Sequence, residues 1–311
     1  MSGETIGLKH SGGQPNRIGI IIVTFNGLEL TRACLTSLRN VAYPHSAVVV
    51  VDNGSTDGSV QLLPKEFPEI HFLPQLVNTG FTGGNNTGIL WCLEKGFDAV
   101  LLLNNDTEVE PAFLAHMAQH LKTQDLVAPQ IRSLRQRDVF VGHIGDFEWN
   151  RGVLSDHFYR PSVLQTASKA FEVGMAGGCC LLIPRAVFES VGLLDTTFFL
   201  YYEDTDFVIR ARASGFRLVY EPQAIIYHLG SSSSGGCRIS PLTLYYNTRN
   251  RLYIMSKYRA IGLGFLLYFF LTRLLYTAHY MISGRWSLLQ AMWRGIRDYY
   301  AGRMGYGEYE W

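Results

Sequence analysis

The sequence predicts an α/β protein with a mostly parallel sheet flanked by helices, followed by a C-terminal helical extension. Three observations lead to this class. Continuous apolar runs occupy residues 18–23, 48–51 and 100–103, and each run ends in polar residues. An amphipathic helical pattern follows the first run. The third observation is the order itself, since strand, polar loop and helix in alternation are typical of a doubly wound sheet.

Composition and charge divide the chain. Its 311 residues are 47% hydrophobic and 17% charged, which fits a globular protein with a sizeable core and excludes a disordered chain. The net charge of +1 hides an asymmetry, because residues 238–311 carry ten Lys and Arg against three Asp and Glu. We therefore expect a flexible N-terminus at 1–16, an α/β domain at 17–237 and a basic, aromatic helical region at 238–311.

The N-terminus and the cysteines favour a cytoplasmic protein. Residues 1–16 are polar and glycine-rich and lack the apolar core of a signal peptide, so we expect no export. The five cysteines are odd in number and form no CxxC pair, which is typical of reduced thiols in a core.

The other elements follow from periodicity. The helix after the first strand should bury one apolar stripe, made of Leu28, Leu30, Cys34, Leu35 and Leu38. A helix should run from about 203 to a stop at Gly215. Further short strands are expected at residues 70–73, 127–129, 217–220 and 224–227.

The stretch from 78 to 88 has four glycines and three asparagines in eleven residues. Such a stretch lets the backbone approach a ligand closely. The apolar residues that follow indicate the start of a helix, whose free N–H groups favour phosphate. The stretch is neither a Walker loop nor a GxGxxG motif, and an ordinary flexible loop is the alternative reading.

Polar side chains follow several of the predicted strands. Asn104 and Asp106 follow the run at 100–103, while Asp52 and His228 each end another run. The carboxyl ends of parallel strands form the ligand crevice of an open α/β sheet. Oxygen ligands with one imidazole suit Mg²⁺ or Mn²⁺ better than zinc. The alternative for Asp106 is a cap on a helix that starts near Pro111.

Two adjacent acids, Glu203 and Asp204, follow an aromatic run. They suit the first turn of a helix, where acidic side chains are favourable. They also suit general-base catalysis, because one carboxylate raises the pKa of its neighbour. Since acids accumulate at one predicted edge, we favour catalysis.

These motifs together resemble the inverting family-2 glycosyltransferases of the GT-A fold, in the rhamnosyltransferase-like branch. The matching segments occur in family order and span about residues 18–253. They are IIVTFNG at 21–27, VVDNGSTDGS at 50–59, NTGFTGGNNTGI at 78–89, LLLNNDTEVEP at 101–111, GGCCLLIPR at 177–185, FFLYYEDTDFVIRARASGF at 198–216, YHLGSSS at 227–233 and YYNTRNRLY at 245–253.

The resemblance implies roles for individual residues. Asp204 would be the catalytic base, with Glu203 beside it. Asp106 closes the triplet at the family's DxD position and would bind a divalent metal, Mg²⁺ or Mn²⁺, together with His228. Asn104 and Asn105 replace the usual acids of that triplet, which lowers the ligand charge. The nucleotide-sugar would contact Thr24, Asn26, Asp52, Asn78, Gly80, Asn85, Asn104 and Asn105.

The reaction implied is a single displacement with inversion. The expected donor is dTDP-L-rhamnose, with a UDP-sugar as the alternative, and the expected acceptor is a glycan or a lipid-linked glycan of a cell-surface polysaccharide. No nucleic acid partner is expected. A non-catalytic subunit that binds a nucleotide-sugar is a second hypothesis. A nucleotidyltransferase is a third, which the lack of a basic phosphate loop disfavours.

The C-terminal tail leaves two alternatives. The apolar run at 261–271 is interrupted by Arg273, and a spanning helix needs about 20 predominantly apolar residues. Flanking basic and aromatic residues favour a helix that lies at the inner face of the cell membrane and binds anionic lipid. Otherwise the tail packs on the catalytic domain or on a second copy of the chain in a homo-oligomer.

Overall fold

The computed structural model describes residues 16–142, 144–155, 159–230 and 239–307. The flexible N-terminus predicted for 1–16 lies outside them, apart from Asn16. The strands are β1 (Ile18–Thr24), β2 (Ser46–Asp52), β3 (His71–Pro74), β4 (Ala99–Asn104), β5 (Thr107–Val109), β6 (Leu126–Ser133), β7 (Ile144–Glu148), β8 (Val153–Ser155), β9 (Phe171–Glu172), β10 (Met175–Ala176), β11 (Cys180–Pro184) and β12 (Leu218–His228).

Helices alternate with these strands through most of the chain. They are α1 (Leu28–Leu38), α2 (Ser59–Glu66), α3 (Gly80–Glu94), α4 (Phe113–Ala118), the 3₁₀ turn η1 (Gln119–Thr123), α5 (Pro161–Thr166), α6 (Arg185–Val191), α7 (Glu203–Ala213), α8 (Pro241–Lys257), α9 (Leu263–Ile282) and α10 (Trp286–Tyr300).

A nine-stranded mixed sheet forms the centre, in the order β3-β2-β1-β4-β11-β6-β12-β5, with β9 paired to β12. Strands β3, β2, β1 and β4 are parallel, as are β6 and β12, and the antiparallel β11 joins the two groups. A smaller sheet has the order β10-β7-β8. The predicted α/β class with a mostly parallel sheet is confirmed.

Burial of both faces explains why β1 is a continuous apolar run. Ile20 and Ile22 pack on one side with residues of α1 and α4, while Ile21 packs on the other with residues of α3 and α7. Polar residues inside such a strand would lose water without gaining partners, so they are confined to its end.

The structure corrects two local predictions. The strands expected at 217–220 and 224–227 form one strand, β12, with a register shift between Glu221 and Ile225. Leu30 is 40% exposed rather than part of the buried stripe of α1. Two glycines of α3 serve packing, because a Cβ on Gly84 or Gly88 would lie 2.7 Å or 2.6 Å from a side chain of β1.

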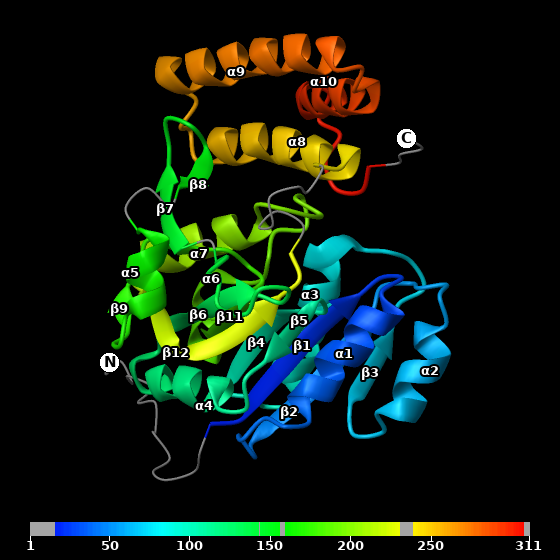
Figure 1. Ribbon diagram of the computed structural model, residues 1–311, viewed down its shortest axis with the longest axis vertical. Helices are drawn as coiled ribbons and strands as arrows, with labels where there is room; N and C mark the ends of the chain where they lie inside the picture. The colour runs from blue at the N-terminus through cyan, green and yellow to red at the C-terminus, as the bar shows by residue number, and fades with distance from the viewer. Residues whose placement is uncertain (1–15, 143, 156–158, 231–238, 308–311) are drawn as a thin grey trace, which may run out of the picture.

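The last three helices lie together at one end of the molecule, beyond the sheet (Figure 1). The hairpin β7–β8 extends toward them, and α7 lies between them and the sheet (Figure 1). The four cysteines that the structure describes, Cys34, Cys92, Cys179 and Cys180, are free thiols. Cys237 lies outside the described residues.

Candidate active site

The carboxyl ends of the strands gather the predicted polar residues at one edge of the sheet. Thr24, Asp52 and Asn104 end the neighbouring strands β1, β2 and β4, and His228 ends β12. These strands run in the same direction, so their ends meet at the ligand edge of an open α/β sheet.

A cleft of about 370 Å³ opens at this edge. It brings together five of the predicted site residues, although they come from separate parts of the chain: Asn104, Asp106, Glu203, Asp204 and His228. Aromatic and apolar side chains complete its wall, among them Phe81, Leu200 and Tyr201. Carboxylates beside aromatic faces suit a polar, ring-shaped substrate.

Asp106 and His228 form the part of the cleft that could hold a metal. Asp106 Oδ1 lies 3.0 Å from His228 Nε2. Asn104 Oδ1 is buried and has no hydrogen-bond partner. The described residues contain no cluster of three His, Cys, Asp or Glu. Such a sparse set fits Mg²⁺ or Mn²⁺, which take one or two carboxylates and complete their coordination with substrate phosphates.

Asp106 does not cap the next helix. Helix α4 begins at Phe113 with Ala112 as its N-cap residue and without a side-chain cap. The short strand β5 intervenes, and its antiparallel pairing with β12 places Thr107 opposite His228. This pairing brings Asp106 next to the histidine, so the capping alternative is wrong.

Asp204 lies at the start of α7 and is held by backbone and side-chain donors. Its Oδ2 accepts a hydrogen bond of 2.6 Å from the N–H of Gly178. Its Oδ1 accepts from the N–H and the hydroxyl of Thr205, at 2.6 and 3.2 Å. A Cβ on Gly178 would lie 2.7 Å from the Cβ of Asp204, so this close approach requires glycine.

Glu203 has different surroundings. It is 4% exposed, and its Oε2 has no hydrogen-bond partner. Burial, with the charge of Asp204 as a second cause, raises the pKa of Glu203 well above its usual range. Adjacent carboxyls in unlike environments are a common arrangement in acid–base sites.

The turn before these acids is strained. Phe199, Tyr201 and Tyr202 have φ values of 64°, 68° and 74°, a region that residues other than glycine rarely adopt. Asn250 of α8 holds this turn, because its amide nitrogen donates to the carbonyls of Phe198, Leu200 and Tyr201 at 2.8–3.0 Å. Strain of this kind persists where the surrounding structure enforces it.

Arg249 provides a second support for the same turn. It is fully buried and donates to the carbonyl of Phe198 at 3.1 Å and to that of Gly305 at 2.9 Å. Sequence reasoning gave no role to Arg249 or Asn250. The signal that could have found them is the segment YYNTRNRLY, which resembles the family but implies no role for either residue.

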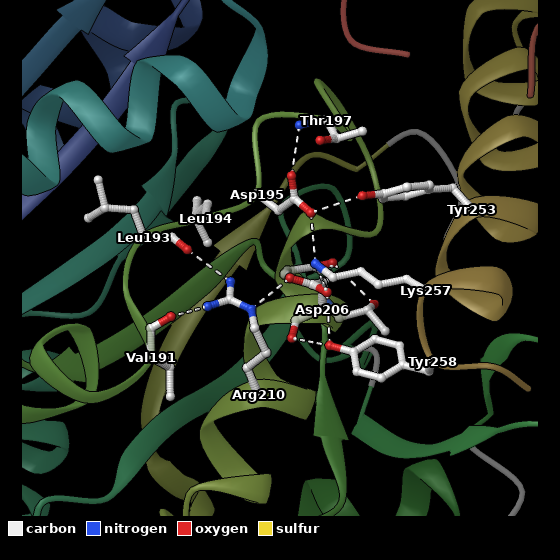
Figure 2. A network of polar contacts seen from close by, with 12 residues as sticks. Val191, Leu193, Leu194, Asp195, Thr197, Asp206, Arg210, Tyr253, Lys257 and Tyr258 are labelled. Atoms are coloured by element: carbon white, nitrogen blue, oxygen red, sulfur yellow. Dashed lines mark hydrogen bonds and ion pairs between the residues drawn. The ribbon is translucent and has the colours of Figure 1, made fainter. Parts of the chain in front are cut away.

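A polar network joins α7 to the end of α8 (Figure 2). Asp206 is fully buried and receives Arg210 Nε at 2.8 Å, Lys257 Nζ at 2.6 Å and the hydroxyl of Tyr258 at 2.9 Å. Lys257 also pairs with Asp195 at 2.7 Å. The start of α7 is therefore fastened to the C-terminal helices as well as to the sheet.

Apart from Asn104, the predicted nucleotide residues do not line this cleft, and Thr24 and Asp52 stand at the ends of β1 and β2. Asp52 is fully buried, and its Oδ1 accepts from the N–H groups of Gly54 and Ser55. Its Oδ2 is also buried and has no hydrogen-bond partner, and its contact with a ligand stays a prediction. Asn53, which sequence reasoning passed over, donates to Asn78 Oδ1 and to the carbonyl of Gly80.

The other nucleotide candidates bond to the protein itself. Asn105 Nδ2 donates to Thr24 Oγ1 at 3.4 Å, and Asn85 Nδ2 donates to the carbonyl of Phe81 at 2.9 Å. Asn26 Oδ1 accepts the N–H of Thr56 at 2.8 Å. None of these three asparagines lines the 370 Å³ cleft, so their contact with a donor stays a prediction.

Comparison with known proteins gives a consistent picture. Residues 19–192 match the family described as Glycosyl transferase family 2. The N-acetylglucosaminyl-diphospho-decaprenol L-rhamnosyltransferase of Mycobacterium tuberculosis is 28% identical over 253 residues, which are 74% of this chain and 81% of that protein. The dTDP-rhamnosyl transferase RfbF of Shigella flexneri is 23% identical over 252 residues, covering 78% of this chain and 81% of its own length.

Solved structures share the fold. The mannosyltransferase PcManGT from Pyrobaculum calidifontis, in complex with GDP-Man and Mn²⁺, has a TM-score of 0.56 at 18% identity, over 93% of this chain and 76% of that one. GalNAc-T7 with UDP, GalNAc and Mn²⁺ has a TM-score of 0.57 at 16% identity, and the match covers 75% of this chain and 48% of that one. The predicted GT-A fold with C-terminal helices is confirmed.

Proposed function

The chain belongs to glycosyl transferase family 2, and from that premise we propose that it transfers L-rhamnose from dTDP-L-rhamnose, with inversion, to a hydroxyl of a glycan or lipid-linked glycan. The family and its fold establish a nucleotide-sugar glycosyltransferase. The rhamnosyltransferases among its relatives support the choice of sugar. The cleft is the observation that carries the proposal, because it brings the Asp106–His228 pair and the two acids of α7 into one cavity.

The proposed roles follow from this arrangement. The carboxylate of Asp204 takes the proton of the acceptor hydroxyl while that oxygen attacks the anomeric carbon from the face opposite the diphosphate. A divalent cation held by Asp106 and His228, with Asn104 beside them, would act as a Lewis acid for the departing diphosphate. Tyr201 and Phe81 offer ring faces for the sugar or for the acceptor.

We propose that the nucleotide binds at the ends of β1 and β2. The unpartnered Oδ2 of Asp52 accepts an N–H of the base or a hydroxyl of the ribose, and Asn53 keeps the loops of Asn78 and Gly80 in place. A buried acceptor that lacks a partner is costly for the fold, which supports its use by a ligand.

Helix α9 supports attachment to the inner face of the cell membrane. It is the one helix of the described residues that is long and apolar enough to cross a membrane, and 22% of its apolar window is buried. Arg273, which interrupts the apolar run in the sequence, is 6% exposed and faces the protein. The exposed face instead carries a row of leucines, Leu267, Leu271, Leu274 and Leu275. A helix exposed on one side and packed on the other suits binding in the plane of the interface.

Calorimetry with dTDP and UDP tests the donor. We expect dTDP to bind and Asp52→Ala to weaken that binding at least tenfold. The matched control is Asp125→Ala, which removes another buried carboxylate, one that pairs with Arg217 away from the cleft. The control should lower the melting temperature and leave dTDP affinity unchanged. Tight binding of UDP without binding of dTDP would contradict the proposed donor, dTDP-L-rhamnose.

Turnover tests the catalytic role. Purified protein should release dTDP from dTDP-L-rhamnose with Mg²⁺ or Mn²⁺, and EDTA should abolish the release. Undiminished turnover in EDTA would remove the metal role. The Asn104-Asn105 pair favours one rival, a non-catalytic subunit that binds the donor. That rival predicts donor binding without release of dTDP or transfer to any acceptor.

A further inference from the structure

Two arginines are buried without a counter-charge between the C-terminal helices. Arg251 of α8 and Arg273 of α9 are 7% and 6% exposed. Neither forms an ion pair with a carboxylate of the described residues, although the structure contains many such pairs elsewhere. The Nε of each guanidinium is buried and has no hydrogen-bond partner.

The contacts of the two guanidiniums do not replace an anion. Arg251 lies over the rings of Tyr268 and Phe269, at 5.4 and 5.6 Å, and donates to the carbonyl of Arg151. Arg273 lies 5.2 Å from the same Phe269 ring and donates to Thr248 Oγ1 at 3.3 Å. The attraction between a cation and an aromatic ring offsets only part of the free energy lost when the cation is removed from water. Burial lowers the pKa of both guanidiniums, and the charge of Arg251 lowers that of Arg273 further.

Elsewhere in the same region the chain satisfies its buried charges. Arg249, two residues from Arg251 on α8, donates to Phe198, Gly305, Tyr245 and Asn250. Buried Asp206 is paired with two cations. The Arg251–Arg273 pair is therefore an exception, because an uncompensated buried charge lowers the stability of the fold, and a stability cost of this kind is a feature of functional sites.

The position of the pair connects it to the cleft. Both arginines lie against the ring of Phe269, and Tyr202 packs against the apolar cluster that contains this ring. Tyr202 immediately precedes the two acids of α7. On its other side the pair adjoins α9, whose outer face is apolar. An anion between the arginines would thus lie between the proposed base and a surface suited to lipid.

We propose that Arg251 and Arg273 bind the phosphoryl group of a lipid-linked acceptor, with its hydrocarbon chain along α9. This assignment rests on the proposed function, because it names the acceptor's anionic group and its route to Asp204. Phosphate oxygens match the N–H groups of two guanidiniums, and such charge-assisted hydrogen bonds are among the strongest that proteins form.

Farnesyl diphosphate serves as the probe, because it combines a diphosphate with a short prenyl chain and carries no sugar. Binding to the full chain is measured by calorimetry and thermal unfolding in EDTA, which removes the metal route to Asp106 and His228. Farnesol and inorganic pyrophosphate test each half of the probe, and phosphatidylcholine vesicles that contain phosphatidylglycerol test binding to an anionic lipid headgroup. We expect farnesyl diphosphate to bind at least tenfold more tightly than either half.

Arg251→Met and Arg273→Met test the site, with Arg249→Met as the matched control on α8. Each of the first two should weaken farnesyl diphosphate at least tenfold while the melting temperature without probe stays the same or rises, because an uncompensated charge is removed. Arg249→Met should lower the melting temperature, because bonded carbonyls lose their donor. Equal destabilisation by all three variants, or unchanged probe affinity, would overturn the proposal.

The remaining arms separate the alternatives. If pyrophosphate binds as tightly as farnesyl diphosphate, the site binds free phosphate, and the proposal of a lipid-linked acceptor is overturned. If both variants lose vesicle binding but keep probe binding, the pair binds a membrane headgroup, and the proposed binding of the acceptor is overturned. The binding of dTDP is titrated separately. If dTDP does not bind, the result with farnesyl diphosphate can still be interpreted, and if farnesyl diphosphate does not bind, the result with dTDP still holds.

Discussion

Glu203 and Asp204 are adjacent in the chain, yet the structure gives their carboxyl groups different surroundings. Asp204 Oδ2 accepts a hydrogen bond from the N–H of Gly178, and the side chain lines the cleft. Glu203 is buried with an unpartnered oxygen and a raised pKa. This difference distinguishes a carboxylate that is held by hydrogen-bond donors from a buried carboxyl whose pKa is raised by burial.

Asp204→Asn keeps the shape of the side chain and removes the charge that accepts a proton. Loss of a general base typically lowers turnover by about 10²–10⁴-fold, and we expect a fall of that order with dTDP affinity nearly unchanged. Single-turnover kinetics and calorimetry measure the two quantities. Near-normal turnover in Asp204→Asn, with none in Glu203→Gln, would move the role to Glu203 and leave Asp204 as the residue that holds Gly178.

Glu203→Gln tests the raised pKa through stability. The unfolded chain releases this proton near its ordinary pKa of 4.5, whereas the folded chain keeps it to higher pH. Above pH 4.5 the folded state therefore binds more protons than the unfolded state, and stability falls as the pH rises.

Glutamine cannot ionise and avoids this loss. We expect Glu203→Gln to melt near the wild-type temperature at pH 4.5 and above it at pH 8, with a milder effect on turnover than Asp204→Asn. Calorimetric melting across this range makes the comparison. A variant that is less stable than wild type at pH 8 would show that the carboxyl is charged and stabilised in the fold.

At the scale of elements, α8 supports the strained turn before α7 from outside the region that matches the family. The family match ends at residue 192, whereas Arg249, Asn250 and Lys257 all contact the segment around α7. The C-terminal helices are thus part of the site's framework, and the boundary expected at 237 separates segments that are packed and bonded to each other. Cutting the chain before Lys257 would leave Asp206 without one of its cations, and an uncompensated buried charge costs about 3–5 kcal/mol.

Asn250→Ala removes the donor that three carbonyls of the turn share. We expect a loss of about 2–3 kcal/mol in the free energy of unfolding, because buried acceptors lose their partner. The strained turn should also relax, which raises amide exchange over 198–205 and lowers turnover at least tenfold. Denaturant melts, hydrogen exchange and dTDP release measure these effects.

The matched control is Gln130→Ala. Gln130 is 1% exposed and donates to the carbonyls of Leu164 and Gln165, away from the turn. Gln130→Ala should lose about as much stability as Asn250→Ala but keep turnover within about threefold of wild type, because the carbonyls that lose their donor lie outside the turn. Equal losses of turnover in both variants would show that Asn250 contributes to stability only.

At the scale of the whole molecule, charge and apolar surface lie at the same end. Residues 238–311 carry the excess of Lys and Arg, and the outer face of α9 is a row of leucines. Figure 1 shows α9 at the end of the molecule farthest from the sheet. A protein bound through this end would keep its sheet in solution.

Vesicle binding tests this orientation. We expect the chain to bind vesicles that contain anionic lipid and to lose affinity as salt rises, because Lys and Arg near the surface contribute about 1 kcal/mol each. Leu267→Ser, Leu271→Ser and Leu274→Ser combined should weaken binding at least tenfold without unfolding, since these side chains are already exposed.

The matched control replaces three exposed leucines elsewhere, at Leu62, Leu76 and Leu90. It should leave vesicle binding unchanged. If instead the α9 variant keeps its vesicle affinity and a concentration-dependent dimer dissociates, the row of leucines is an interface between two copies of the chain.

The sequence by itself determined the class of fold and the edge at which the site forms. Both depend on local patterns, because a run such as 100–103 is buried on both faces and must place Asn104 and Asp106 beyond its end. The direction of the strands then brings those ends together with Asp52 and His228. Pattern and strand direction required no knowledge of distant contacts.

Tertiary structure alone decided which side chains face which partners. Asn250 reaches Phe198, and Lys257 reaches Asp206, across about 50 residues of chain. Arg273 looks like an interruption of an apolar run, and only the packing of α9 on α8 turns it inward beside Arg251. Periodicity defines the faces of a helix but not the element that covers each face, because that choice is made by packing between segments distant in the chain.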